Sequence, residues 1–485
     1  MSRTQSPPAV ASQQKARLER ALLVVGVLAL GFNLRGAITS LPPVFPELQG
    51  RLGLSGATVS LLAATPVICF GVVSGFAAAL ARRAGEERVL LGAMIALTAG
   101  LVARGVAPRA LLFPGTILLS GAIAVMNVLL SSLIKRRWPE RAGFLIGMYI
   151  TALSAGAIVA SLVSVPLWQG TGGSVALTLG WLAIPAAFGA LLWLPQTAVR
   201  RPGAGAGPRR VRRAAGPLAP AVAGEAPETP AAAATGAAAV PARPAKLTVR
   251  RYALAWHVTL FMGMQSLLYY AALSWLPTML RDRGVSAADA GDLLALMGAG
   301  NLAVSLVIPV IAQRMRSQLL LVVPTVAALA GGLAGLLYAP LGGAVGWALI
   351  LGAGQNAALG LAVFFTAARA PHAAAAASLS ALAQSVGYLL ASAGPLEVGL
   401  LHSATGNWTV PVMVLFAFNA VLLVAGTLAA RPRMLPPADL PPADLPPADL
   451  PPAGRSPGGR SPAGRSPGDH APAPPPASPP AGEAP

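Results

Sequence analysis

The chain has 485 residues, of which 55% are hydrophobic and only 11% are charged, and its mean hydropathy is +0.66. A soluble globular protein carries roughly 25% charged residues, and a single core could not bury this much apolar surface. The composition therefore excludes an ordinary water-soluble protein. The net charge of +19 does not indicate a nucleic-acid-binding protein, because the basic clusters lie between apolar runs and few aromatic residues accompany them.

Twelve apolar runs follow one another along the chain, each close to the length of about 20 residues that spans a bilayer. The first six cover residues 21–41, 57–81, 89–106, 110–134, 142–165 and 174–195. The second six cover residues 253–276, 288–312, 318–338, 342–367, 375–400 and 409–430. We predict an all-α integral membrane protein with 12 transmembrane helices in two pseudo-symmetric six-helix bundles, residues 21–199 and 252–430.

Three further segments have a different composition. Residues 1–20 are polar and basic, residues 200–251 form a basic linker rich in Ala, Pro and Gly, and residues 431–485 form a proline-rich tail with LPPAD repeats. We predict that the linker and the tail are disordered. Most Lys and Arg residues fall on one side of the predicted spans; the other side receives Arg51, Arg104, Arg109, Arg281 and Arg283. This bias predicts a multi-pass protein of the cell (cytoplasmic) membrane with both termini in the cytoplasm.

The two halves repeat each other in sequence. The first span ends in LPPVFPELQGRLGLS (41–55), and the seventh ends in LPTMLRDRGVS (276–286). Each has Leu-Pro at the end of a span, a short polar crossing, and a Ser before the next span. Repeated halves are typical of transporters, whose substrate site lies between the halves near the bilayer midplane.

Arg35 is the one charged residue inside the first apolar run. It lies about 14 residues into the helix, roughly 21 Å at 1.5 Å per residue. An arginine within a span costs at least a few kcal/mol and usually faces the bundle interior. Two interpretations stay open: a fixed positive charge for an anionic substrate, with Thr39 on the same face, or a side chain that reaches to the outer headgroups.

Other spans carry polar side chains at helical spacing. The sequence leaves two interpretations open: these side chains line a substrate cavity, or they form hydrogen bonds between helices. The candidates for the cavity are Asn127, Gln265, Tyr269, Tyr270, Gln355, Asn356 and Gln384. Tyr270 is the repeat partner of Arg35.

Motifs of other function classes are missing from the sequence. The sequence contains a single cysteine, no GxxxxGK[ST] phosphate loop and no spacing typical of metal ligands. We therefore expect no enzyme activity, no cofactor and no metal. We expect a small-molecule substrate, the lipid bilayer as surroundings, no nucleic acid and a monomer. Acidic residues are nearly absent from the spans, so the coupling ion is undefined, although protons stay a candidate.

The arrangement of six plus six spans around a basic loop resembles the major facilitator superfamily. Within it, NLRGAITSLPP (33–43) resembles the pattern of the cyanate transporter and 2-nitroimidazole exporter family. Three further blocks are similar to that family: LSSLIKRRWPER (130–141), FMGMQSLLYYAALSWLPTML (261–280) and AQSVGYLLASAGPLEVGLLH (383–402). The resemblance implies a secondary active or facilitative carrier of a small polar or anionic, cyanate-like solute that works by alternating access. The alternative is an efflux carrier for nitroimidazole-like or other small aromatic compounds.

The loop after the second span departs from the superfamily pattern. Arg82 occupies the place of the usual Asp, while Arg83 and Gly85 match the pattern. We expect these residues, and Arg314 in the equivalent loop of the second half, to act in gating, with Arg82 paired to Glu86. A membrane sensor or scaffold that binds partners through the proline-rich tail is a function of a different class that the sequence leaves open.

Overall fold

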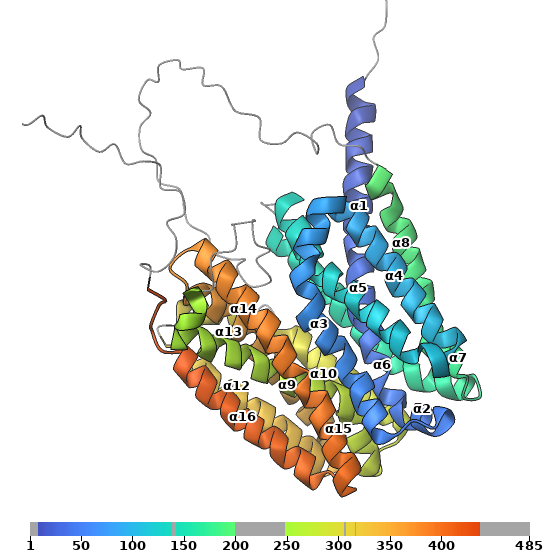
Figure 1. Ribbon diagram of the computed structural model, residues 1–485, viewed down its shortest axis with the longest axis vertical. Helices are drawn as coiled ribbons and strands as arrows, with labels where there is room; N and C mark the ends of the chain where they lie inside the picture. Colours follow the sequence, from blue (N-terminus) through green and yellow to red (C-terminus); the bar gives the residue numbers. More distant parts are fainter. Residues whose placement is uncertain (1–7, 138–141, 199–247, 305–306, 316, 437–485) are drawn as a thin grey trace, which may run out of the picture. The chain divides into compact units, whose positions relative to one another are not determined.

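The computed structural model describes residues 8–137, 142–198, 248–304, 307–315 and 317–436. The predicted basic linker and proline-rich tail lie almost entirely outside these residues. Within the described part, every regular element is a helix (Figure 1). The prediction of an all-α protein is confirmed.

The first half contains six spans, the last of which is formed by two consecutive helices, and two short additional elements. Its elements are α1 (Pro8–Thr39), η1 (Pro42–Val44), α2 (Phe45–Leu52), α3 (Gly56–Ala84), α4 (Glu86–Val106), α5 (Pro108–Arg137), α6 (Ala142–Gly170), α7 (Val175–Gly180) and α8 (Ala183–Ala198). The helix α1 ends just before Pro42 and Pro43, which lack the backbone N–H that would continue it. The short helix α2 then turns the chain into α3.

The second half follows the same plan. Its elements are η3 (Thr248–Arg251), α9 (Ala253–Asp282), α10 (Ala287–Val304), α11 (Val307–Arg314), α12 (Leu319–Tyr338), η4 (Leu341–Gly343), α13 (Ala344–Ala368), α14 (Ala373–Ala391), α15 (Ala393–Thr405) and α16 (Thr409–Ala429). The predicted span 375–400 is divided at Ser392, because Pro395 cannot donate a helical hydrogen bond to the carbonyl of Ala391.

The repeat seen in the sequence is also present in the helix starts. Ser55 caps α3, and its Oγ accepts a hydrogen bond of 3.2 Å from the backbone N–H of Thr58. Ser286 precedes α10, and its Oγ accepts a hydrogen bond of 3.1 Å from the N–H of Asp289. Both serines therefore begin the second span of their half in the same way.

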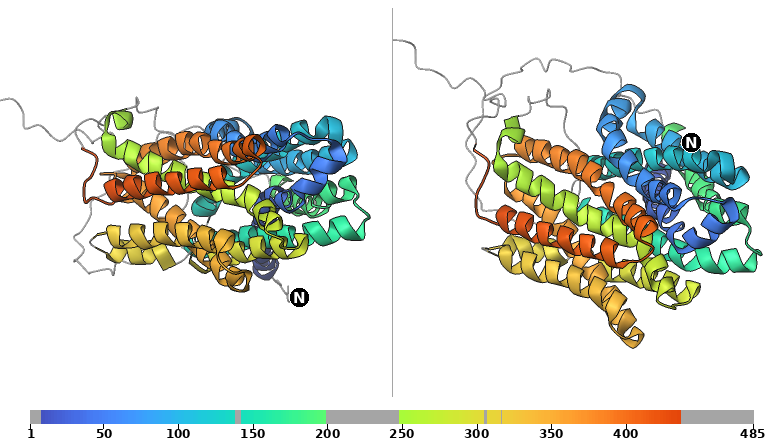
Figure 2. Two further views of the ribbon diagram at one scale, coloured as in Figure 1. Left: turned by 90° about the horizontal axis from the view of Figure 1, so that it is seen from below. Right: turned by 60° about the horizontal axis from the view of Figure 1, so that its bottom comes forward.

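The helix packing repeats between the halves as well (Figures 1 and 2). The helix α1 packs on α6 as α9 packs on α14, and α4 packs on α5 as α12 packs on α13. The two halves meet where α6 packs on α10 and where α3 packs on α14 and α15. Two pseudo-symmetric bundles of six spans result, as the sequence predicts.

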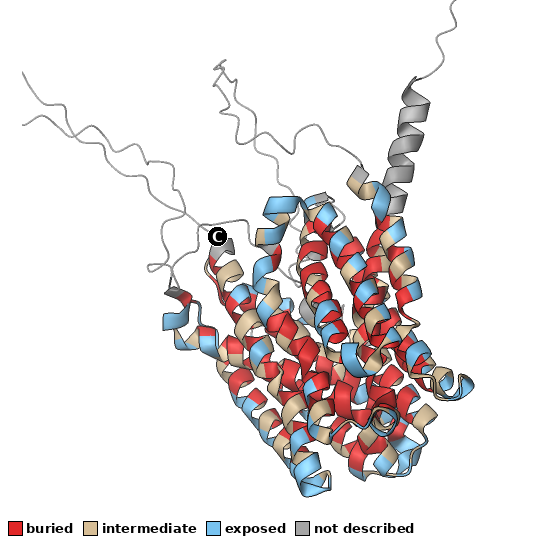
Figure 3. Cartoon of the chain, turned by 45° about the vertical axis from the view of Figure 1, so that its right-hand side comes forward, coloured by how far each residue is buried: buried red, intermediate tan, exposed pale blue. Residues whose placement is uncertain are grey.

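By length and mean hydropathy alone, 10 segments of the described chain qualify as membrane spans. The helix α9 is not among them, since Gln265, Ser266, Tyr269 and Tyr270 lower its hydropathy. It is buried along nearly its whole length, so it needs no apolar face toward lipid. Peripheral helices show the opposite pattern: Ile184 on α8 is 76% exposed, and exposed residues lie along the outer faces in Figure 3. Exposed apolar side chains of this kind are suited to contact with lipid.

Candidate functional site

Arg35 lies in the last two turns of α1 and is half-buried. Its guanidinium carbon Cζ sits 4.7 Å from the centre of the Tyr269 ring, on the face of that ring. Tyr269 belongs to α9, so this contact joins the first half of the molecule to the second. A cation over an aromatic face is attracted by the ring quadrupole, and the ring also covers one face of the guanidinium.

Three more tyrosines surround the same charge. Tyr270 is a hydrogen-bond partner of the Arg35 guanidinium, and Tyr149 and Tyr388 lie near enough to interact with it electrostatically. They come from α9, α6 and α14, respectively. The chain contains 6 tyrosines, so four of them gather around one arginine. We call Arg35 and these four residues the tyrosine cage.

Phe70 of α3 extends the cage. Its ring meets Tyr270 edge-on at 6.3 Å and Tyr388 edge-on at 6.0 Å between ring centroids, and Tyr269 and Tyr270 meet at 5.0 Å. Edge-to-face geometry is a favourable arrangement of aromatic pairs. The cage therefore has a rigid aromatic wall built from α3, α9 and α14.

No carboxylate of the described residues forms an ion pair with Arg35. The tyrosine hydroxyls are neutral groups that can donate or accept a hydrogen bond. The cage thus holds one uncompensated positive charge among hydroxyl groups. Such a site can bind an anion or a strongly polar group through charge-assisted hydrogen bonds.

Two of the predicted site residues support the cage from outside. Asn127 of α5 accepts a hydrogen bond of 3.0 Å from the Tyr149 hydroxyl through Oδ1, which orients that ring. Thr39 is buried, and its hydroxyl lies 3.2 Å from the Ala157 carbonyl of α6 and 3.1 Å from the Arg35 carbonyl. The Thr39 hydroxyl therefore links α1 to α6 through a backbone carbonyl of each helix.

The other predicted residues are not brought to the Arg35 guanidinium by any hydrogen bond in the described chain. Gln265 is buried and donates to the Met262 carbonyl at 3.1 Å and to Ser266 Oγ at 2.6 Å. Gln384 donates to Ser380 Oγ at 2.9 Å. Asn356 is half-buried on α13, and Gln355 lines a separate cavity within the second half.

The predicted gating residues lie at helix ends. Gly85 joins α3 to α4 with a φ of +87°, a conformation that favours glycine, and Arg82 and Arg83 are exposed just before it. Arg314 is exposed at the end of α11. The expected pairing of Arg82 with Glu86 is wrong: Glu86 forms an ion pair of 2.9 Å with Arg136 of α5.

That correction has a structural cause. Gly85 redirects the chain between the two helices, and Glu86 begins α4, which packs along α5. The carboxylate therefore meets the basic end of α5 rather than the end of α3.

Sequence reasoning missed several residues that shape this region. Tyr149 and Phe70 were not among the candidates, and Tyr388, which shares a polar stripe with Gln384, was not chosen as a site residue, although the scarcity of tyrosine was a usable signal. Arg104 was placed with the loop residues, yet it is fully buried on α4. It donates to the Leu179 carbonyl at 3.1 Å and to the Ala37 carbonyl at 3.3 Å.

Comparison with known proteins agrees with this architecture. Residues 23–395 match the family model described as Major Facilitator Superfamily. The chain belongs to this superfamily, and it is a membrane transporter rather than an enzyme.

Two relatives share 34% sequence identity with the chain. One is "Uncharacterized transporter YycB" of Bacillus subtilis, aligned over 418 residues that cover 85% of this chain and 94% of the relative. The other is the 2-nitroimidazole transporter of Escherichia coli, with 85% and 96% covered. The cyanate transport protein CynX of Escherichia coli is 28% identical, with 86% and 97% covered. The resemblance to the cyanate and 2-nitroimidazole family is confirmed.

Solved structures support the fold alone. A bacterial homologue of the lysosomal transporter Spinster, in an inward-facing and unoccupied conformation, has a TM-score of 0.61 at 17% identity and covers 86% of this chain and 98% of its own. A D-xylose–proton symporter has a TM-score of 0.60 at 14% identity and covers 86% and 100%. The predicted major facilitator fold is thereby confirmed.

Proposed function

We propose that the chain carries a small anionic or strongly polar solute across the cell membrane and binds it at Arg35. The observation that carries this proposal is the uncompensated guanidinium in the tyrosine cage, at the contact between the two halves. Removing this charge from water is costly, and a bound anion offsets that cost. The substrate would therefore complete a site that lacks a carboxylate in the described chain.

The proposed mechanism is alternating access. Arg35 and Tyr149 belong to the first half, and Tyr269, Tyr270 and Tyr388 belong to the second. A relative movement of the halves would therefore change the contacts of a substrate that is bound between them. Rocking of two bundles about a fixed site is the usual way in which repeated halves transport a solute. We further propose cytoplasmic termini, from the bias of basic residues, and a monomeric carrier for which protons are a candidate coupling ion.

A second candidate is the transport of nitroimidazole-like aromatic compounds. Two observations favour it: the 34% identity to the 2-nitroimidazole transporter, and the aromatic wall of Phe70 with the cage tyrosines. An aromatic solute could stack on these rings. In that case the Arg35 guanidinium would hydrogen-bond the electron-rich oxygens of a nitro group.

Substitution of Arg35 tests the first candidate. We expect Arg35→Ala to weaken binding of a transported anion about 10- to 150-fold, the equivalent of roughly 1.5–3 kcal/mol for a hydrogen bond to a charged group. Arg35→Lys should retain part of the affinity, because it keeps the charge but loses the planar fork of donors. Arg109→Ala, at an exposed arginine of α5, serves as the control.

The measurement is uptake into proteoliposomes that contain the purified variants, with cyanate and 2-nitroimidazole as separate substrates. Loss of cyanate uptake in Arg35→Ala with retention in Arg109→Ala supports the anion carrier. Loss of only 2-nitroimidazole uptake favours the second candidate. Unchanged transport of both compounds by Arg35→Ala would remove Arg35 from the site.

A further inference from the structure

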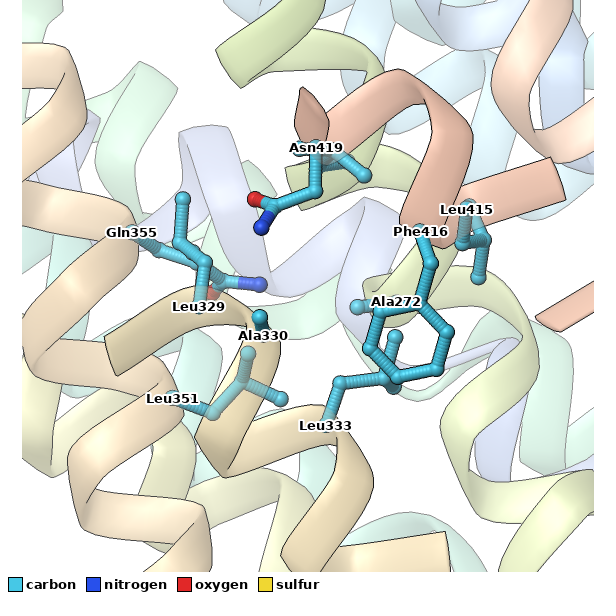
Figure 4. A pocket seen from close by; sticks show the side chains of 10 residues that line it. Ala272, Leu329, Ala330, Leu333, Leu351, Gln355, Leu415, Phe416 and Asn419 are labelled. Carbon is cyan, nitrogen blue, oxygen red and sulfur yellow. The ribbon is translucent and has the colours of Figure 1, made fainter. Parts of the chain in front are cut away.

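A cavity lies within the second half of the molecule, among α9, α12, α13 and α16 (Figure 4). Ten residues line it, and eight of them have apolar side chains, among them Leu333 of α12 and Phe416 of α16. The two polar ones are both amides, Gln355 of α13 and Asn419 of α16. The space that the centre of a water molecule can occupy in it is about 20 Å³.

The two amides leave hydrogen-bonding groups unused. Gln355 is only 3% exposed, and neither its Nε2 nor its Oε1 has a partner in the described chain. Asn419 is 7% exposed; its Nδ2 donates to the Val326 carbonyl at 3.2 Å, whereas its Oδ1 has no partner. Figure 4 shows both amide groups reaching into the cavity. Buried amide groups without partners are strongly disfavoured in an apolar environment.

This cavity is distinct from the tyrosine cage. On α9, Leu268 and Ala272 are one helical turn apart and share the face that lines the cavity. Tyr269 and Tyr270 are turned away from that face by about 100° and 200°, at 3.6 residues per turn. The helix α9 therefore separates the two sites, with the cage on one side and the amides on the other.

We propose that Gln355 and Asn419 bind one buried water molecule in this cavity. A cavity that admits the centre of a water molecule has room for a water, and a buried water needs two to four polar partners, which the unused amide atoms supply. The water would donate to Gln355 Oε1 and Asn419 Oδ1 and accept from Gln355 Nε2. All three unused amide atoms would then be satisfied by one molecule.

The lining argues against other occupants. A metal cation needs about six oxygen ligands and usually a carboxylate, but the lining supplies two amide oxygens and no charge. An apolar molecule would leave the three amide atoms unpaired. The bridging water thus links α13, which carries Gln355, to α16, which carries Asn419, behind the helix that holds Tyr269 and Tyr270.

A double-substitution cycle tests the link between the amides. Gln355→Leu, Asn419→Leu and the double variant are compared by thermal unfolding of the purified full chain in detergent. Each single variant should lower the Tm, because it removes one partner of the water and leaves the other amide unpaired. The double variant should lose clearly less than the sum of the two single shifts. Additive shifts, or a rise in Tm in either single variant, would overturn the proposal.

A matched control uses Gln265, a buried glutamine on α9 whose amide is already bound to Met262 and Ser266. The cycle of Gln265→Leu with Asn419→Leu should be additive. If this cycle shows the same coupling, the effect does not come from a shared water, and the proposal fails.

Radiolytic footprinting distinguishes a water from a direct bond between the two amides. Bound water produces hydroxyl radicals in place and labels adjacent side chains, so Phe416 and Leu333 should be oxidised in the wild-type protein and protected in the double variant. Coupling between the amides without labelling of Phe416 would mean that the amides bind each other directly, and would overturn the water site.

Discussion

Arg35 and Arg104 both lie within membrane-spanning helices, and their surroundings differ in kind. Arg104 is fully buried, and its guanidinium donates to the backbone carbonyls of Ala37 and Leu179. These carbonyls lie at the carboxyl ends of α1 and α7, where the helix dipole is negative. Arg35 instead faces aromatic rings and hydroxyls. The guanidinium of Arg104 therefore stabilises the fold, whereas the guanidinium of Arg35 keeps N–H donors that can bind a ligand.

We predict that Arg104→Leu destabilises the protein. The substitution leaves the buried Leu179 carbonyl without the guanidinium donor and the buried Ala37 carbonyl with only the Ser40 hydroxyl, at 3.4 Å, so the loss should exceed about 2 kcal/mol. Thermal unfolding in detergent would measure it. Arg109→Leu, an exposed arginine five residues further on, is the control and should leave the Tm nearly unchanged. Equal Tm values for the two variants would show that the backbone contacts of Arg104 contribute little.

The sequence identifies Arg35 but not its surroundings. A charge in an apolar run stands out in the sequence, and the repeat singles out Tyr270, which is a hydrogen-bond partner of Arg35 in the structure. Tyr149 and Tyr388 lie on spans far away in the chain, and which of their faces meet α1 depends on tertiary packing. Arg104 lies close to the end of its run, so the sequence alone did not separate a buried helix cap from a loop residue.

Arginines also satisfy the ends of helices in the second half. Arg283 donates to the carbonyls of Leu336 and, at 2.9 Å, Ala339, at the carboxyl end of α12. Arg369 donates to Ala429 at 2.8 Å and Ala430 at 3.1 Å, at the carboxyl end of α16. The last carbonyls of a helix have no partner within it, and water is scarce near the hydrocarbon. Part of the positive charge of this protein is thus structural.

The contact of α1 with α6 depends on Gly156, and we predict that Gly156→Val disrupts it. A side chain at this position would overlap the carbonyl oxygen of Phe32, one turn before Arg35. Overpacking of this kind costs about 1–3 kcal/mol, and a displaced α1 would also move the guanidinium. We expect a lower Tm and weaker transport. Gly147→Val on the same helix, where a Cβ would meet nothing within 4 Å, is the control, and equal behaviour of the two variants would contradict the prediction.

At the level of elements, the apolar runs predict the number and order of the spans but not where a helix is broken. The two sets of six runs and the paired serine caps are present in the structure. The break at Ser392 depends on one proline within an apolar run, and such prolines also occur inside unbroken helices, for example Pro66 in α3. The helix α2 was read as a polar crossing, because eight residues are too few for a periodic pattern to be recognised.

In the whole molecule, the described contacts between the halves gather toward the end that carries Glu47. Glu47 forms an ion pair of 2.8 Å with Arg281, and the rings of Phe45 and Trp275 lie 6.0 Å apart. At the end that carries Arg83, the ion pair of Glu86 joins two helices of the same half. The structure is therefore closed at the Glu47 end, and alternating access requires this closure to separate in each cycle.

A disulfide across the Glu47 end should stop transport. A Cβ placed on Gly56 of α3 lies 3.0 Å from the Cβ of Ser403 on α15, so Gly56→Cys and Ser403→Cys bring two thiols together after a shift of about 0.5–1 Å. We expect oxidation of this double variant, in a Cys69→Ala background, to abolish uptake into proteoliposomes, and reduction to restore it. The physical reason is that a covalent bond between α3 and α15 prevents the halves from parting.

A second cysteine pair separates this effect from a general loss of flexibility. A Cβ on Gly354 of α13 lies 3.1 Å from that of Ala328 on α12, within the same half. Gly354→Cys with Ala328→Cys should form a disulfide and keep its transport, because helices of one half move together when two bundles rock. If the fully oxidised Gly56–Ser403 pair still transports substrate, the Glu47 end does not open during the cycle, and the substrate must pass the tyrosine cage by another route.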